Sequence, residues 1–336
     1  MRIDRRSQAG AGASNTCQAR RPVKSYPEIG GAGDRFPAEV TGSACQAPTA
    51  VLLGRMMIPV ALSIAGSDPS GGAGVQADLK TFHQLRVFGT AAITLITVQN
   101  TTRVSRVETL DPALVAEQIA AVLEDMHPRA AKTGAMGTAA IIEAVGKRWR
   151  DAPPGCPLVV DPVMISKHGA PLMDAGGRGA LRDFLIPQAA LVTPNLPEAS
   201  ELADMPVETA DQMKEAAIRI ARSGSRSLPV SVLIKGGHLA GPGFEDETLD
   251  ILYHHGGFSE FRAPRVDTRH THGTGCTYSA AITALLARGF AMPDAVAGAK
   301  QFVDAAIRTA PGLGAGAGPV NHWADAGMRF AVKHSL

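Results

Sequence analysis

The sequence predicts an α/β fold in which a mostly parallel central sheet is flanked by helices on both faces. Two observations lead to this prediction. Short apolar runs alternate with amphipathic stretches from Val60 onward, and strands that alternate with helical crossovers are typical of parallel sheets. Runs such as "PVALSIAG" and "PLVVDPVM" are also almost continuously apolar, as expected of strands buried on both faces.

Six short apolar runs, each bounded by turn residues, are the predicted strands. They are Val60–Ala65, Ala91–Val98, Ala130–Lys132, Leu158–Asp161, Leu191–Thr193 and Val230–Ile234. Five segments between them have helical character. They are Val75–Leu85, Pro112–Met126, Thr138–Arg150, Arg178–Phe184 and Ala210–Ser223. Each of the first five strands is therefore followed by a crossover helix.

The pattern changes after Leu249. Two short segments, Leu249–Tyr253 and Phe258–Arg262, predict an antiparallel hairpin. Two further helices are expected at Gly275–Arg288 and Pro293–Ala310, before a glycine-rich loop at residues 312–318. Because no internal repeat and no linker-length break interrupts residues 58–336, we expect them to form one domain.

Residues 1–57 differ from the rest of the chain. They are rich in Gly, Ala, Ser, Arg and Pro without periodicity, which predicts a disordered extension, or a segment ahead of a true start at Met56 or Met57. This segment holds eight Lys and Arg against four Asp and Glu, whereas the whole chain carries only +2. A slightly acidic body with 4% aromatic residues argues against a nucleic-acid partner.

The cysteines and the hydropathy pattern indicate where in the cell the protein is located. Four scattered cysteines without a CxxC pair suggest neither disulfides nor structural zinc, so we expect a cytoplasmic protein. The most apolar stretch, residues 51–66, is interrupted by Arg55 and Pro59. We therefore expect no membrane-spanning helix.

A glycine-rich cluster, "AGSDPSGGAG" at residues 65–74, directly follows the first strand. Small residues there let the backbone approach a ligand, and the next helix offers unpaired N–H groups. The spacing matches neither the dinucleotide-binding nor the Walker pattern. An ordinary glycine-rich turn is the alternative.

A second cluster, "THGTGC" at residues 271–276, opens a later helix. A turn containing Gly273 and Gly275 at a helix start forms an anion hole, because several N–H groups and the helix dipole converge there. Cys276 lies in the first turn, where the dipole is expected to lower the thiol pKa. It is a candidate base for a substrate hydroxyl. The alternative is a small buried cysteine that packs a helix start.

Three other strand ends carry polar side chains suited to a nucleotide. Lys235 follows a strand and can reach polyphosphate, while Asn195 and Glu198 place two oxygen ligands one helical turn apart, as Mg²⁺ prefers. Asp161, with Lys167 nearby, ends another strand. Helix capping is the alternative reading of Asn195 and Glu198. Ligands bind at the carboxyl ends of strands in open parallel sheets, so their common position predicts a site.

Seven motifs resemble, in order and spacing, those of the hydroxymethylpyrimidine/phosphomethylpyrimidine kinases of the ribokinase-like superfamily. They are "SIAGSDPSGGAGVQADLKTF", "TVQNT", "KTGAMG", "VVDPVM", "TPNLPEA", "IKGGH" and "THGTGCTYSAA". The resemblance covers about residues 58–325. It implies a three-layer ribokinase-like fold and the ATP-dependent phosphorylation of 4-amino-5-hydroxymethyl-2-methylpyrimidine, then of its monophosphate to the pyrophosphate. A homodimer is implied by family habit.

The resemblance also implies roles for individual residues. Cys276 acts as the base within the anion hole formed by Gly273 and Gly275, and Lys235, Lys167 and Thr274 serve ATP, with Asn195 and Glu198 on the Mg²⁺ side. The pyrimidine site implied is Gly66, Ala73, Asp78, Thr97, Gln99 and Val163. Gln99 carries an amide that both donates and accepts, which suits an aminopyrimidine edge.

One position departs from the family pattern. Ala135 stands in "KTGAMG" where a bulkier methionine is expected to line the site. Either Met136 compensates or the pocket is roomier, which leaves strict substrate choice open.

Two other functions compete with this interpretation. A pyridoxal or pyridoxine kinase would act on a similar flat heteroaromatic ring, although the residues around Gln99 favour the pyrimidine. A non-catalytic pyrimidine sensor would have an eroded phosphate site, which the presence of Lys235, Asn195, Glu198 and residues 273–276 contradicts.

Overall fold

A computed structural model of the chain describes residues 58–167, 169–223, 230–237, 239, 244–325 and 327. The predicted disorder of residues 1–57 lies outside the described residues, and so does His238 of the "IKGGH" motif.

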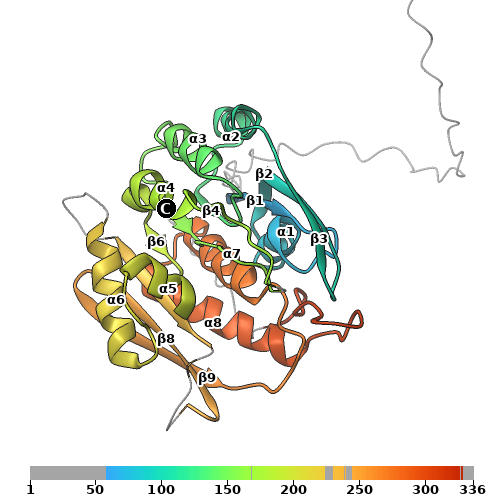
Figure 1. Cartoon of the computed structure of the whole chain (residues 1–336), viewed down its shortest axis with the longest axis vertical. Coiled ribbons are helices and arrows are strands. Elements are labelled where there is room, and N and C mark those ends of the chain that lie inside the picture. The colour runs from blue at the N-terminus through green and yellow to red at the C-terminus, as the bar shows by residue number, and fades with distance from the viewer. Residues whose placement is uncertain are drawn as a thin grey trace, which may run out of the picture. The chain divides into compact units, whose positions relative to one another are not determined.

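Nine strands of the described chain form one sheet in the order β3-β2-β1-β4-β5-β6-β7-β8-β9 (Figure 1). Six neighbouring strands, from β2 to β7 in this order, run parallel. They are β1 (Val60–Ser67), β2 (Phe88–Gln99), β4 (Ala130–Thr133), β5 (Leu158–Val160), β6 (Leu191–Val192) and β7 (Ser231–Gly236). All six predicted strands are therefore confirmed.

Both edges of the sheet are antiparallel. β8 (Glu247–His254) and β9 (Gly257–Pro264) form the predicted hairpin beside β7. At the other edge, β3 (Val104–Thr109) pairs with β2. The sequence did not predict β3, because its residues "VSRVET" are half-buried or exposed and include no apolar run.

The predicted helices are also present, with small shifts at their ends. They are α1 (Gly74–Gln84), α2 (Pro112–Asp125), α3 (Ala139–Trp149), α4 (Gly177–Ala180), α6 (Ala210–Ser223), α7 (Thr274–Ala287) and α8 (Met292–Arg308), with a short α5 (Leu196–Ala203) that had been expected only as a helix start. α4 continues into a π-helical segment, Leu181–Leu185, and a 3₁₀ turn, Ile186–Gln188. Within the described residues, no helix has the length and apolar character needed to cross a membrane.

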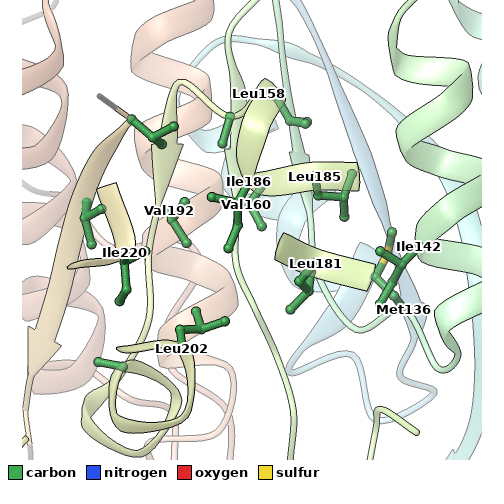
Figure 2. Close-up of a cluster of buried hydrophobic side chains, with 14 of the residues drawn as sticks. Met136, Ile142, Leu158, Val160, Leu181, Leu185, Ile186, Val192, Leu202 and Ile220 are labelled. Atoms are coloured by element: carbon green, nitrogen blue, oxygen red, sulfur yellow. The ribbon is translucent and has the colours of Figure 1, made fainter. Parts of the chain in front are cut away.

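Two hydrophobic cores lie on opposite faces of the sheet, which makes the fold three-layered. Alternate strand residues enter different cores: Leu158 and Val160 pack with α2, α3, α5 and α6, whereas Val159 packs with α1, α7 and α8. This alternation follows from the pleat of a strand. Figure 2 shows part of the first core.

Met136 belongs to the first core. Its side chain is 1% exposed and lies beside Ile142 (Figure 2). This position in the core is against the interpretation that Met136 replaces the expected methionine at position 135.

Candidate active site

Asp161, at the end of β5, connects three strands and a helix. Lys235 of β7 donates to Asp161 Oδ1 at 2.9 Å, and the Thr193 hydroxyl donates to the same oxygen at 3.1 Å. The Ser279 hydroxyl of α7 donates to Asp161 Oδ2 at 3.1 Å. The carboxyl ends of β5, β6 and β7 thus meet the first turns of α7, as the topological rule for parallel sheets predicts.

Lys235 places a cation beside the turn that opens α7. A Cβ atom built on Gly275 would lie 3.4 Å from the Lys235 ammonium. Burial works against its charge, but the carboxylates of Asp161 and Glu198 outweigh that effect and raise the pKa of Lys235. The side chain therefore stays cationic beside the helix start.

The turn before α7 depends on glycine. Gly273 has a φ of +79° and its missing side chain leaves room for Gly72, whose carbonyl oxygen would lie 1.7 Å from an added Cβ. The N–H groups of Gly275 and Cys276 lie in the first turn of α7. No helical carbonyl precedes them, so neither has a hydrogen-bond partner within the helix. Thr274 is less available, because its hydroxyl donates to the Thr271 carbonyl at 2.7 Å.

Cys276 lies in the first turn of α7, as predicted, but its thiol is not acidic. Burial raises the pKa of Cys276 to about 11, against the opposing effects of the Lys132 charge and a hydrogen bond with the Gly74 backbone. The expectation that the helix dipole would lower this pKa is therefore wrong, because loss of hydration outweighs the dipole. Cys276 is a thiol at neutral pH.

Asn195 and Glu198 form a reciprocal cap at the start of α5. The Asn195 side chain accepts the Glu198 N–H and the Glu198 side chain accepts the Asn195 N–H, both at 2.9 Å. Burial raises the pKa of Glu198 to about 7, partly offset by Lys235. Among the described residues no group of three His, Cys, Asp or Glu could hold a metal. The Glu198 carboxylate keeps free lone pairs that could bind one Mg²⁺ held mainly by phosphate oxygens. The described residues do not supply a complete set of protein ligands for a metal.

The loop between β1 and α1 is held by Asp68. Its carboxylate accepts the Ala73 N–H at 2.9 Å and lies 2.7 Å from His272 Nε2. Burial disfavours the charge, but hydrogen bonds from His272 and Ser70 hold the pKa of Asp68 below its usual value. Gln99 Nε2 lies 3.1 Å from the same His272 nitrogen. The two glycine clusters of the sequence are thus joined by a buried Asp–His contact.

The remaining predicted substrate residues lie at the ends of β1, β2 and β5. Gly66 packs against Leu95, since an added Cβ would lie 2.5 Å from that side chain. Thr97 is buried, and its hydroxyl donates to the Ser67 carbonyl at 3.0 Å. Val163 is half-buried and Lys167 is exposed, both in the segment after β5.

Asp78 does not lie at the site surface. Its side chain is fully buried, and Lys132 and Ser63 bind both of its oxygens. The prediction that Asp78 contacts the pyrimidine disagrees with this geometry, because no oxygen of its carboxylate is accessible to a ligand.

Four polar residues of this region were not among the predicted site residues: Asp68, His272, Ser279 and Lys132. All four lie inside the quoted motifs, and for Asp68 and His272 the available signal was a titratable residue within each glycine cluster. Lys132 follows two alanines in a buried strand. A lysine in such a position signals a buried ion pair.

Comparison with known proteins decides the family. The family model described as "Phosphomethylpyrimidine kinase" matches residues 68–321. The chain belongs to this family. A hydroxymethylpyrimidine/phosphomethylpyrimidine kinase of Bacillus subtilis is 43% identical over 270 residues, covering 80% of this chain and 96% of the relative.

Two further relatives widen the comparison. The thiamine biosynthesis bifunctional protein ThiED of Geobacter sulfurreducens is 44% identical over 78% of this chain, which spans about half (51%) of that protein. The pyridoxal kinase of Staphylococcus aureus, solved with AMP-PCP and pyridoxal, is 36% identical with a TM-score of 0.71, over 80% of this chain and 94% of that structure. The fold of this family is therefore also found in a pyridoxal kinase.

Proposed function

We propose that this chain is an ATP-dependent kinase that phosphorylates 4-amino-5-hydroxymethyl-2-methylpyrimidine, and then converts its monophosphate to the pyrophosphate in thiamine biosynthesis. The arrangement of Gly273, Gly275 and Cys276 at the start of α7, with the Lys235 ammonium beside it, carries this proposal. Such a site combines an anion hole, a fixed cation and a proton acceptor. Family membership supports the choice of substrate.

The proposed transfer uses each of these groups once. The proton of the substrate hydroxyl passes to the Cys276 thiolate as the alcohol oxygen bonds to the γ-phosphorus, and the bond from phosphorus to the bridging oxygen breaks to release ADP. Lys235 and the amides of Gly275 and Cys276 hold the transferring phosphoryl group, while Thr274, whose hydroxyl donates to the Thr271 carbonyl, fixes the turn that presents them. Lys167, which is exposed, would contact the phosphates of the nucleotide.

Mg²⁺ would be held by Glu198, with Asn195 fixing the orientation of that carboxylate, and it would supply positive charge to the phosphates. Glu198 has a pKa of about 7 because of burial, and a neighbouring cation favours its ionised form. The pyrimidine would lie among Gly66, Ala73, Thr97, Gln99 and Val163.

The test is a product assay. Protein incubated with Mg²⁺-ATP and the hydroxymethylpyrimidine should form a monophosphate and then a pyrophosphate, both identified by mass. A parallel tube holds pyridoxal, the second candidate substrate, which the likeness to the Staphylococcus aureus pyridoxal kinase favours. If pyridoxal phosphate is the sole product, the assignment of the pyrimidine as substrate is wrong. If neither substrate is phosphorylated although the pyrimidine still binds, the kinase assignment is wrong and the protein is a pyrimidine sensor.

Activity should rise with pH. Because the pKa of Cys276 is about 11, the thiolate is the minor form at neutral pH and increases about tenfold per pH unit. Glu198 does not add to this trend, because the Mg²⁺ that it would hold at saturating Mg²⁺-ATP favours its ionised form. We therefore expect kcat/KM for the pyrimidine to increase from pH 6 to 9, measured at saturating Mg²⁺-ATP. A decline over that range would contradict Cys276 as the base.

We also propose that the kinase works as a homodimer, as the family resemblance implies, and that it is located in the cytoplasm, as its scattered cysteines indicate. Sedimentation equilibrium of the purified chain measures the first of these properties.

A further inference from the structure

A buried ion pair lies outside the proposed transfer. Lys132 of β4 and Asp78 of α1 are both fully buried, and the Lys132 ammonium lies 2.9 Å from each oxygen of the Asp78 carboxylate. The Ser63 hydroxyl donates to Asp78 Oδ2 at 2.6 Å. Burying two charges is unfavourable, and such a pair is weak support for a fold by itself. A functional reason for the pair is therefore worth seeking.

The pair is close to the sulfur of Cys276 along α1. The backbone of Gly74, the first residue of α1, hydrogen-bonds the Cys276 sulfur. Asp78 follows Gly74 by four residues, so the two share one face of the helix one turn apart. The Lys132 ammonium therefore contacts α1 one helical turn after Gly74, the residue whose backbone contacts the Cys276 sulfur.

The sheet places Lys132 beneath α7. Lys132 and Ser63 are direct neighbours in the pairing of β4 with β1. Ala130, two residues before Lys132 in β4, packs in the core formed with α1, α7 and α8. Because side chains two apart in a strand share a face, Lys132 projects toward the layer that carries Cys276.

The starts of α1 and α7 lie against each other, since a Cβ built on Gly273 would lie 3.4 Å from Ala73 Cα. Charges from four different elements influence the Cys276 thiol there: Lys132 of β4, Asp78 of α1, Asp161 at the end of β5, and Lys235 of β7. Lys132 has the largest favourable influence on the thiolate, and it exceeds the opposing influence of Asp78. The pair as a whole is neutral, so its effect on the sulfur comes from the larger influence of the ammonium. Asp78, Cys276 and Asp161 in turn keep Lys132 protonated despite its burial.

We propose that Lys132 is a positioning residue for Cys276: its ammonium, fixed by Asp78 and Ser63, stabilises the thiolate that accepts the substrate proton. The catalytic meaning of this role rests on the proposed kinase function. The electrostatic role itself concerns only the thiol, so it can be measured without any substrate.

The experiment removes both charges at once, because deleting one partner would leave an unpaired buried charge. The full-length Lys132→Met/Asp78→Asn variant and the wild type are alkylated with iodoacetamide between pH 7 and 10.5, and modification of the Cys276 peptide is followed by mass. The thiolate is the reacting form. We expect Cys276 in the variant to react about tenfold more slowly at pH 9, equivalent to a rise of about one pKa unit.

A matched control removes a different buried ion pair on the same side of the sheet. Lys300 of α8 and Asp250 of β8 are 2.7 Å apart and nearly buried. In Lys300→Met/Asp250→Asn, Cys276 alkylation at pH 9 should stay within about twofold of the wild type. A purely structural ion pair predicts the same small change in both variants. Equal alkylation rates in the two folded variants would therefore overturn the proposal.

The single variant Lys132→Met provides an independent test of sign, which remains available if the double variant does not fold. It removes the ammonium, and whether Asp78 then stays ionised or takes up a proton, the sulfur has lost its favourable cation, so alkylation should become slower than in the wild type. Faster or unchanged alkylation in the folded variant would count against the proposal. If alkylation shifts as expected but neither pyrimidine nor pyridoxal is phosphorylated, the kinase function fails while the role of Lys132 stands.

Discussion

The Cys276→Ala variant should lose about 10²–10⁴-fold in kcat for the pyrimidine, the range typical of a lost general base. Cys276 occupies the first turn of α7, where the Gly74 backbone hydrogen-bonds its sulfur. Alanine keeps the helix start and its amides, so the KM for ATP should change by less than about threefold. Initial rates with each substrate varied in turn separate the two effects.

The second described cysteine is the matched control. Cys156 precedes β5, at the opposite end of the strands from the site, and its sulfur donates to the Pro128 carbonyl at 3.2 Å. Burial raises its pKa to about 12. Cys156→Ala should leave kcat within about twofold. If Cys276→Ala kept full activity, the base would have to be another group.

Replacement of Gly273 by alanine should reduce kcat/KM by about 10²–10³-fold, the scale for damage to an oxyanion-type donor. At a φ of +79° a side chain is strained, and its Cβ would lie 1.7 Å from the Gly72 carbonyl oxygen. Because that neighbour is backbone, the turn before α7 or the 65–74 loop must move. Steady-state kinetics measure the loss, and thermal unfolding measures the accompanying loss of stability.

A matched variant at Gly289 distinguishes the effect of backbone strain from that of the steric clash with Gly72. Gly289 follows the other end of α7 with a φ of +86°, and no atom lies within 4 Å of a Cβ built there. Gly289→Ala should lower the unfolding temperature but leave kcat/KM within about twofold. Equal losses of activity in the two variants would mean that strain alone, and not the packing of Gly273 on Gly72, explains the effect.

The central sheet was predictable because its strands are both apolar and separated by helical segments. "VLIK" and "LVV" leave few alternatives when buried on two faces. β3 was missed for the opposite reason: it is an edge strand with polar, exposed residues, stabilised by pairing with β2 and not by its own hydrophobicity. The π-helical segment after α4 likewise has no sequence signal that periodicity could detect.

The site was predictable where local geometry decides it, and not where burial does. Gly273, Gly275, Cys276 and Lys235 do lie together, because strand ends and helix starts meet at one edge of the sheet. Proximity in the sequence could not reveal that Asp78 is bound by Lys132, 54 residues away. The pKa of Cys276 was misjudged for the same reason, because desolvation depends on what the whole chain packs around the thiol.

The contact between Asp68 and His272 joins residues 204 positions apart in the chain. Contacts of this kind form late, since closing so long a loop is entropically unfavourable until most of the sheet exists. A refolding chain would therefore acquire its helices and inner strands before the glycine loop of residues 65–74 meets the turn at residues 271–276. The recovery of catalytic competence during refolding would then lag behind the recovery of secondary structure.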